Sequence, residues 1–233
     1  MGALDDGFAI ESLRRCALFA HADDRILAEV ARGLRRRRFK RNEVIFHQGD
    51  PGDSLHIIAT GAAKIVLPSA EGEEAIIASL RPGDFFGELA LLDGATRSAT
   101  ATALEPTETL VLPRVVFREL LDADARLRDA LLEGLAHELR RITGHVEELH
   151  FLDLAGRLAM RLVRLAREDD PTASGEVHLD WPYTQSDLAS MIGGTRQSVN
   201  KLLSGLVGDG LVSIERETLV IMDVDRLARR AER

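Results

Sequence analysis

The feature that most constrains the fold of this chain is a long stretch without proline, residues 114–170. Apolar residues recur through it with helical spacing, and Leu135, Ile142 and Leu149 lie seven positions apart. A seven-residue repeat is typical of the seam between two helices. A helix this long cannot bury its apolar stripe within a small domain, so we expect a dimerisation helix that breaks near Asp153; an ordinary core helix is the alternative.

Short apolar or alternating runs fill the region before this stretch, residues 39–113. Turn signals rich in glycine and proline separate them, for example at 49–53 and 81–84. Many short strands at even spacing predict an antiparallel barrel or roll. Residues 9–33 precede them with helical periodicity. We therefore predict an α+β fold that starts with helices and an antiparallel, jelly-roll-like β-roll.

Within the strand region, residues 81–104, which we call the cassette, carry the most informative chemistry. Gly87 lets the backbone approach a ligand closely, and the first N–H groups of the short helix expected after it lack internal partners. Such groups form an anion site, to which Arg97 adds a forked cation and Ser98 a hydroxyl. Glu88 would repel a phosphate but suits a ribose hydroxyl, which donates to it.

The C-terminal part, residues 184–212, has the pattern of a helix-turn-helix. Thr184 is expected to cap the first helix with Asp187, over 185–192, and Thr195 to cap the second, over 196–209. Between them two glycines form the turn. The second helix would present polar side chains that read base edges or phosphates in a major groove: Arg196, Gln197, Asn200 and Lys201. Residues 211–222 read as a hairpin, which would form a wing.

The cassette resembles the phosphate-binding segment of the cyclic-nucleotide-binding domain family, through Phe86 to Leu91 and Arg97 to Thr100. The resemblance implies that Glu88 binds the ribose 2′-hydroxyl and Arg97 the cyclic phosphate. Further contacts are implied for Gly87, Leu89, Ala90 and Ser98. In activators of the family, adjacent hydroxyls of the dimer helix contact adenine; here Thr143 keeps a hydroxyl and Ile142 does not.

The order of sensor, long helix and winged helix resembles the CRP/FNR regulators over nearly the whole chain. The recognition helix of that family commonly runs Ser-Arg-Glu-Thr-Val-x-Arg, where this chain has Thr-Arg-Gln-Ser-Val-Asn-Lys. Arg196 is then expected to read a guanine, whereas Gln197 and Lys201 depart from the pattern and predict a related but different palindrome. The implied DNA contacts are Thr184, Thr195, Arg196, Gln197, Ser198, Asn200 and Lys201.

Together with these patterns, the resemblance implies a dimeric, DNA-binding transcription regulator with three parts: residues 1–117, 118–153 and 154–233. It favours cAMP as the effector. The alternatives are cGMP, a cyclic dinucleotide, a haem-bound gas, or DNA binding without an effector. Double-stranded DNA, RNA polymerase and a second copy of the chain are the expected partners. A net charge of −8 argues against a general polyanion binder, so the DNA contact must be local.

Several classes are not expected. An enzyme is disfavoured because no Walker loop or G-x-S-x-G motif occurs, and Arg141 stands where a helical zinc-protease motif needs histidine, so we name no catalytic residue. The single cysteine, Cys16, cannot hold a cluster or a structural zinc alone, and no metal is expected. No apolar run is long enough for a bilayer and the start is acidic, which predicts a cytoplasmic protein without membrane contact.

Overall fold

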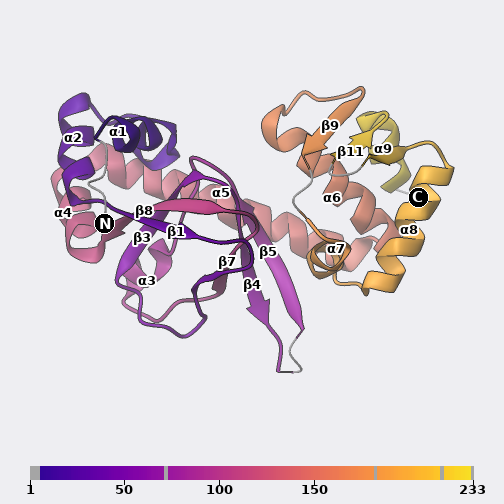
Figure 1. Ribbon diagram of the computed structural model, residues 1–233, viewed down its shortest axis with the longest axis horizontal. Helices are drawn as coiled ribbons and strands as arrows, with labels where there is room; N and C mark the ends of the chain where they lie inside the picture. Colours follow the sequence, from indigo (N-terminus) through magenta and orange to yellow (C-terminus); the bar gives the residue numbers. More distant parts are fainter. Residues whose placement is uncertain (1–5, 71–72, 181–182, 216–217, 232–233) are drawn as a thin grey trace. The chain divides into compact units, whose positions relative to one another are not determined.

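A computed structural model describes residues 6–70, 73–180, 183–215 and 218–231 (Figure 1). The chain divides into two compact units, one ending at Arg140 and the other beginning at Arg141. Parts of three predicted features fall outside the described residues: residues 216–217 of the hairpin predicted at 211–222, residues 71–72 of the strand region predicted at 39–113, and Trp181, the last residue of a short strand predicted at 177–181. Among the described residues, no helix is both long and apolar enough to cross a membrane.

The first unit begins with helices, as the periodicity of residues 9–33 predicts. They are α1 (Asp6–Arg15), the short 3-10 helix η1 (Ala17–Phe19) and α2 (Asp24–Gly33). Asp23 caps α2, because its Oδ1 accepts a hydrogen bond of 3.0 Å from the backbone N–H of Ile26.

Two four-stranded sheets follow, and all their strand pairs are antiparallel (Figure 1). One has the order β1-β8-β3-β6 and the other β2-β7-β4-β5. The strands are β1 (Arg35–Phe39), β2 (Val44–Phe46), β3 (Ser54–Thr60), β4 (Ala63–Pro68), β5 (Glu74–Leu80), β6 (Phe85–Phe86), β7 (Thr100–Ala103) and β8 (Thr107–Pro113). The predicted antiparallel roll is confirmed, although it begins at Arg35 rather than near 39, because four exposed arginines hide the first strand from a hydropathy pattern.

The central strand β3 separates two apolar clusters, because successive side chains of a strand point to opposite faces. Leu55 and Ile57 pack into a cluster shared with the N-terminal helices. Ile58 belongs to the second cluster, with Phe39 and Phe86. His56 lies on the same side of the strand as Ile58, so a polar ring enters an apolar interior.

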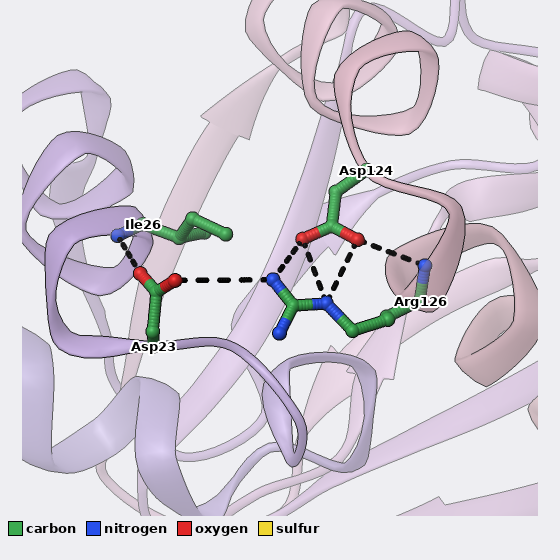
Figure 2. Close-up of polar contacts among 4 residues, drawn as sticks. All are labelled: Asp23, Ile26, Asp124 and Arg126. Atoms are coloured by element: carbon green, nitrogen blue, oxygen red, sulfur yellow. Dashed lines mark hydrogen bonds and ion pairs between the residues drawn. The ribbon is translucent and has the colours of Figure 1, made fainter.

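The long helical stretch is divided at Asp124, which the sequence did not predict. α4 spans Arg114–Ala123 and α5 spans Ala125–Phe151. The carboxylate of Asp124 accepts from the backbone N–H of Arg126 at 2.9 Å and pairs with its guanidinium at 2.7 Å (Figure 2). Such local bonds from an Asp side chain compete with helix continuation. Arg126 also lies 3.9 Å from a carboxylate oxygen of Asp23, which links this break to the start of α2.

The second unit holds the end of α5 and a winged helix-turn-helix. Asp153 caps the next helix by accepting from the N–H of Gly156 at 2.7 Å, which confirms the predicted break. The second unit also contains a three-stranded antiparallel sheet with the strand order β10-β11-β9. The elements are α6 (Leu154–Asp169), β9 (Val177–Asp180), α7 (Gln185–Ile192), α8 (Arg196–Gly208), β10 (Val212–Glu215), β11 (Thr218–Ile221) and α9 (Val224–Ala231).

Candidate functional site: the cassette and the recognition helix

A sharp turn connects β6 to the short helix α3 (Glu88–Asp93) in the cassette. Gly87 makes this turn with φ of +85°, a left-handed conformation that L side chains rarely adopt. A Cβ at this position would collide with Nη1 of Arg97. Both the backbone angle and the close approach of the guanidinium therefore require glycine.

Arg97 is almost completely buried, with 3% of its surface exposed. Its Nη1 donates to the carbonyl of Gly87 at 2.8 Å, and its Nη2 donates to the carbonyl of Ser54 at 2.8 Å. The guanidinium carbon lies 4.2 Å from the ring centroid of Phe46. Its Nε is buried and has no hydrogen-bond partner among the residues that the structure describes. At least one donor of this permanent cation therefore lacks a hydrogen-bond acceptor among the described residues.

The charges around Arg97 are mainly carboxylates. Burial lowers the pKa of Arg97, and Asp53 and Glu88 oppose this effect. Burial raises the pKa of Glu88, and the like charge of Glu138 on α5 adds to the rise, whereas Arg97 opposes it. Guanidinium stays protonated in proteins, so the site keeps one strong cation beside a carboxylate that accepts hydrogen bonds. This arrangement can bind a ligand with both an anionic group and hydroxyl donors.

The structure brings most of the predicted cassette residues together. Ala90 is buried against Gly52, where a Cβ would collide with the alanine methyl group, whereas Leu89 is exposed. Ser98 is exposed, and its carbonyl accepts from Nε2 of Gln48 at 3.2 Å. Thr143 lies in the second unit on α5, and its contact with a ligand stays a prediction.

Sequence reasoning missed Ser54 and Phe46, which contact the Arg97 guanidinium together with Gly87. Ser54 lies 43 residues from Arg97 along the chain. Phe46 ends β2 and packs against the second apolar cluster, and a phenylalanine there reads as ordinary core. No local signal in the sequence distinguishes either residue.

His56 is a buried base beside this site, with 2% of its surface exposed. Its Nδ1 lies 3.2 Å from Oγ1 of Thr109, and its ring stacks on Phe86 with centroids 5.2 Å apart. Burial, followed by the positive charges of Arg97 and Arg37, lowers the pKa of His56 from 6.5 to about 3. The imidazole therefore remains neutral at physiological pH.

We expect His56 to make the fold sensitive to acid. Since the unfolded chain takes up this proton near pH 6.5 and the folded chain only near pH 3, the folded state loses stability as pH falls between these values. Between pH 7 and pH 5, the free energy of unfolding should fall by about 2 kcal/mol because of this one histidine. Urea unfolding at both pH values should show that His56→Phe removes this part of the acid loss. An equal loss in variant and wild type would contradict the assignment.

The helix-turn-helix has the caps that the sequence predicts. The Oγ1 of Thr184 accepts from the N–H of Asp187 at 3.1 Å, and the Asp187 carboxylate accepts from the N–H of Thr184 at 2.9 Å. Gly193 ends α7 in the left-handed region with φ of +67°. A contact that the sequence did not predict fixes this turn: Nη1 of Arg157 on α6 donates to the carbonyl of Ile192 at 2.8 Å.

The recognition helix α8 divides into a buried and an exposed face. The Oγ1 of Thr195 accepts from the N–H of Ser198 at 3.2 Å and so caps the helix, and the hydroxyls of the two residues lie 2.9 Å apart. The buried face packs against the unit. It consists of Val199, Leu203 and Leu206. The exposed face consists of Arg196, Gln197, Asn200 and Lys201. Its donors and acceptors suit base edges and phosphates.

An apolar stripe along α5 stays exposed in the single chain. The sequence prediction named Leu135, Ile142 and Leu149, and the structure adds a second row. The α5 stripe comprises Leu132, Leu135, Leu139, Ile142, Val146 and Leu149, with spacings that alternate between three and four. All but the half-buried Leu135 expose between 44% and 66% of their surface. Spacings that alternate between three and four are typical of the contact between two paired helices. Two earlier leucines of the same helix, Leu127 and Leu131, are not part of the stripe because they pack into the core of the first unit.

Two family profiles match separate parts of this chain. A cyclic nucleotide-binding domain matches residues 36–124, and a Crp-like helix-turn-helix domain matches residues 156–230. The chain is 31% identical over 221 residues to the CRP-like cAMP-activated global transcriptional regulator of Mycobacterium tuberculosis, which covers 95% of this chain and 99% of the relative. It is also 31% identical to the cAMP-activated regulator Vfr of Pseudomonas aeruginosa, over 85% of this chain and 92% of Vfr.

Solved structures share the fold. FixK2 from Bradyrhizobium japonicum superimposes with a TM-score of 0.75 at 22% identity, over 84% of this chain and 96% of FixK2. A CRP-family transcriptional regulator from Thermus thermophilus superimposes with a TM-score of 0.69 at 25% identity, over 84% of this chain and 97% of that protein. The sensor roll, long helix and winged helix-turn-helix therefore recur together, in the same order, in these proteins.

Proposed function

Because this chain belongs to the CRP/FNR family of transcription regulators, we propose that it reads a palindromic DNA site as a homodimer and that a cyclic nucleotide in the cassette controls this binding. The family consists of DNA-binding regulators rather than enzymes. Sensing is assigned to residues 1–117, dimerisation to 118–153 and DNA binding to 154–233. Inside a bacterial cytoplasm, RNA polymerase is the expected partner of the DNA-bound dimer.

The observation that carries the effector is the buried Arg97 with its free Nε. A buried donor without an acceptor costs free energy, and a cyclic phosphate oxygen would satisfy it while neutralising the charge. Glu88 would accept from the ribose 2′-hydroxyl. Gly87, Leu89 and Ala90 would contribute backbone groups, and Ser98 its hydroxyl. No metal is needed for these contacts.

We favour cAMP as the nucleotide, since the relatives matched over most of this chain are named as cAMP-activated. Thr143 of α5 would contact the adenine with one hydroxyl, and Ile142 supplies none. We therefore expect cAMP to bind more weakly than it would to a site with two hydroxyls. A nucleotide shifts the protein toward DNA binding only if it binds the DNA-competent state more tightly.

On DNA, Arg196 would read a guanine, and Gln197, Asn200 and Lys201 would contact neighbouring bases or phosphates. Thr184, Thr195 and Ser198 lie at the helix starts, where hydroxyls and N–H groups meet phosphates. Half-sites would be about 34 Å apart, one turn of DNA.

Arg196→Ala tests the DNA assignment. The loss of one bidentate contact per half-site should weaken binding to the selected palindrome by about 1–3 kcal/mol per contact and relax the preference at that base pair. A mobility shift with the selected site and with sites substituted at each position, with and without cAMP, measures both.

Arg196→Lys is the matched control, because it keeps the charge and loses the planar fork. Its binding to random DNA should equal that of the wild type, while its discrimination falls. Unchanged affinity and unchanged base preference in Arg196→Ala would remove α8 from the DNA interface.

A further inference from the structure

The Arg97 guanidinium has an aromatic neighbour in addition to the Gly87 and Ser54 carbonyls. The ring of Phe46 lies 4.2 Å from the guanidinium carbon, within the range of a cation–π contact. Phe46 itself packs against His56 and Phe86, with ring centroids 5.7 Å away from each. His56 and Phe86 stack on one another. We call Phe46, His56 and Phe86 the aromatic platform.

The platform comes from three strands in both sheets of the roll. Phe46 lies on β2, His56 on β3 and Phe86 on β6. His56 and Phe86 are paired directly in the register of β3 and β6. The bond of His56 to Thr109 on β8 adds a fourth strand and fixes the imidazole. The three rings therefore support one another from three strands, and the Phe46 ring lies against Arg97 on one side and against His56 and Phe86 on the other.

The chemistry of the platform also suits a cation. The faces of aromatic rings carry partial negative charge and attract a guanidinium without taking any of its hydrogen-bond donors. A neutral His56 avoids placing a second positive charge near Arg97, and its low pKa keeps it neutral at physiological pH. The platform thus contacts the guanidinium face without using any of its hydrogen-bond donors.

We propose that Phe46 is a positioning residue for nucleotide binding, which holds the Arg97 guanidinium in the cassette so that its free donor meets the phosphate. This inference rests on the proposed function, since it concerns the affinity of the same site. A flexible arginine loses side-chain freedom when it binds a ligand, and a preset one loses less. Phe46 therefore raises affinity for cyclic nucleotides through Arg97, without touching the ligand.

The chain offers a matched control in Phe39. It belongs to the same apolar cluster, is buried, and lies under a different arginine, Arg37, at 4.9 Å. Phe39→Leu and Phe46→Leu remove the same atoms from the same roll, but only Phe46→Leu removes the ring beside Arg97. Phe46→Tyr keeps that ring.

The experiment uses the full chain and two measurements. In the first, arginine-labelled protein without ligand is observed by NMR, with the Arg97 side-chain resonances assigned by their loss in Arg97→Lys. A ring face at 4.2 Å should shift these protons upfield in the wild type, in Phe46→Tyr and in Phe39→Leu, and not in Phe46→Leu. In the second, calorimetry with cAMP should give Phe46→Leu roughly tenfold weaker binding, with Phe46→Tyr and Phe39→Leu near wild type.

Equal affinities of Phe46→Leu and Phe39→Leu, or tighter binding by Phe46→Leu, would overturn the inference. So would an Arg97 resonance that does not respond to Phe46→Leu. Failure of the wild type to bind cAMP would instead count against the proposed effector. In that case, the Arg97 side-chain NMR shifts of the wild type and Phe46→Leu would still show whether Phe46 holds Arg97.

Discussion

Replacing Arg97 by Gln should abolish the response to cyclic nucleotide and leave DNA-binding residues intact. The guanidinium is the cation nearest the proposed phosphate, and its removal leaves a buried anion facing Glu88 and Asp53. Truncating one partner of a buried charge pair commonly costs about 2–5 kcal/mol, so nucleotide affinity should fall by at least about thirtyfold. Calorimetry with cAMP and a mobility shift with and without it measure the two effects.

Arg126→Gln is the charge-matched control for this experiment. Arg126 lies in the same unit, and its contacts are with Asp124 and Asp23 at the exposed helix break (Figure 2). It should bind nucleotide like the wild type. Because Arg97 also bonds two carbonyls, thermal unfolding of Arg97→Gln should be recorded alongside. A folded Arg97→Gln protein that still responds fully to nucleotide would show that the cassette is misassigned.

A charge in the α5 stripe should separate the protomers and thereby remove specific DNA binding. Leu139→Glu places a carboxylate at an exposed apolar position of the proposed seam, where burial against a second helix would leave it without a partner. The dimer should become a monomer in sedimentation velocity. Because two linked half-sites bind about 10²–10⁴ times more tightly than one, affinity for the palindrome should fall by at least about a hundredfold.

Val115→Glu supplies the comparison. Val115 lies on α4 and is 66% exposed, as Leu139 on α5 is, but it is not part of the stripe. It should remain dimeric and bind DNA normally. If Leu139→Glu sediments as a dimer, the stripe serves another purpose and the seam must lie elsewhere.

Local rules predicted much of this protein correctly. The capping box of Thr184 and Asp187, the helix break near Asp153 and the turn at Gly87 all depend on residues within a few positions of each other. The heptad spacing likewise indicated an exposed stripe on the long helix. The prediction named only one row of this stripe and missed the second row, which contains Leu139. The spacing also did not separate the stripe from Leu127 and Leu131, which continue the apolar pattern but are buried by the protein's own core.

The sequence by itself determined the order of the parts, the caps and turns that bound their helices, and the residue types of the cassette and the recognition helix, since these follow from short-range backbone chemistry. Only the tertiary structure decided where the Arg97 guanidinium lies. Ser54 and Phe46 reach it from distant strands, and strand register, not spacing along the chain, brings them there. The same holds for the division between buried and exposed apolar residues of α5, which depends on what packs against each turn of the helix.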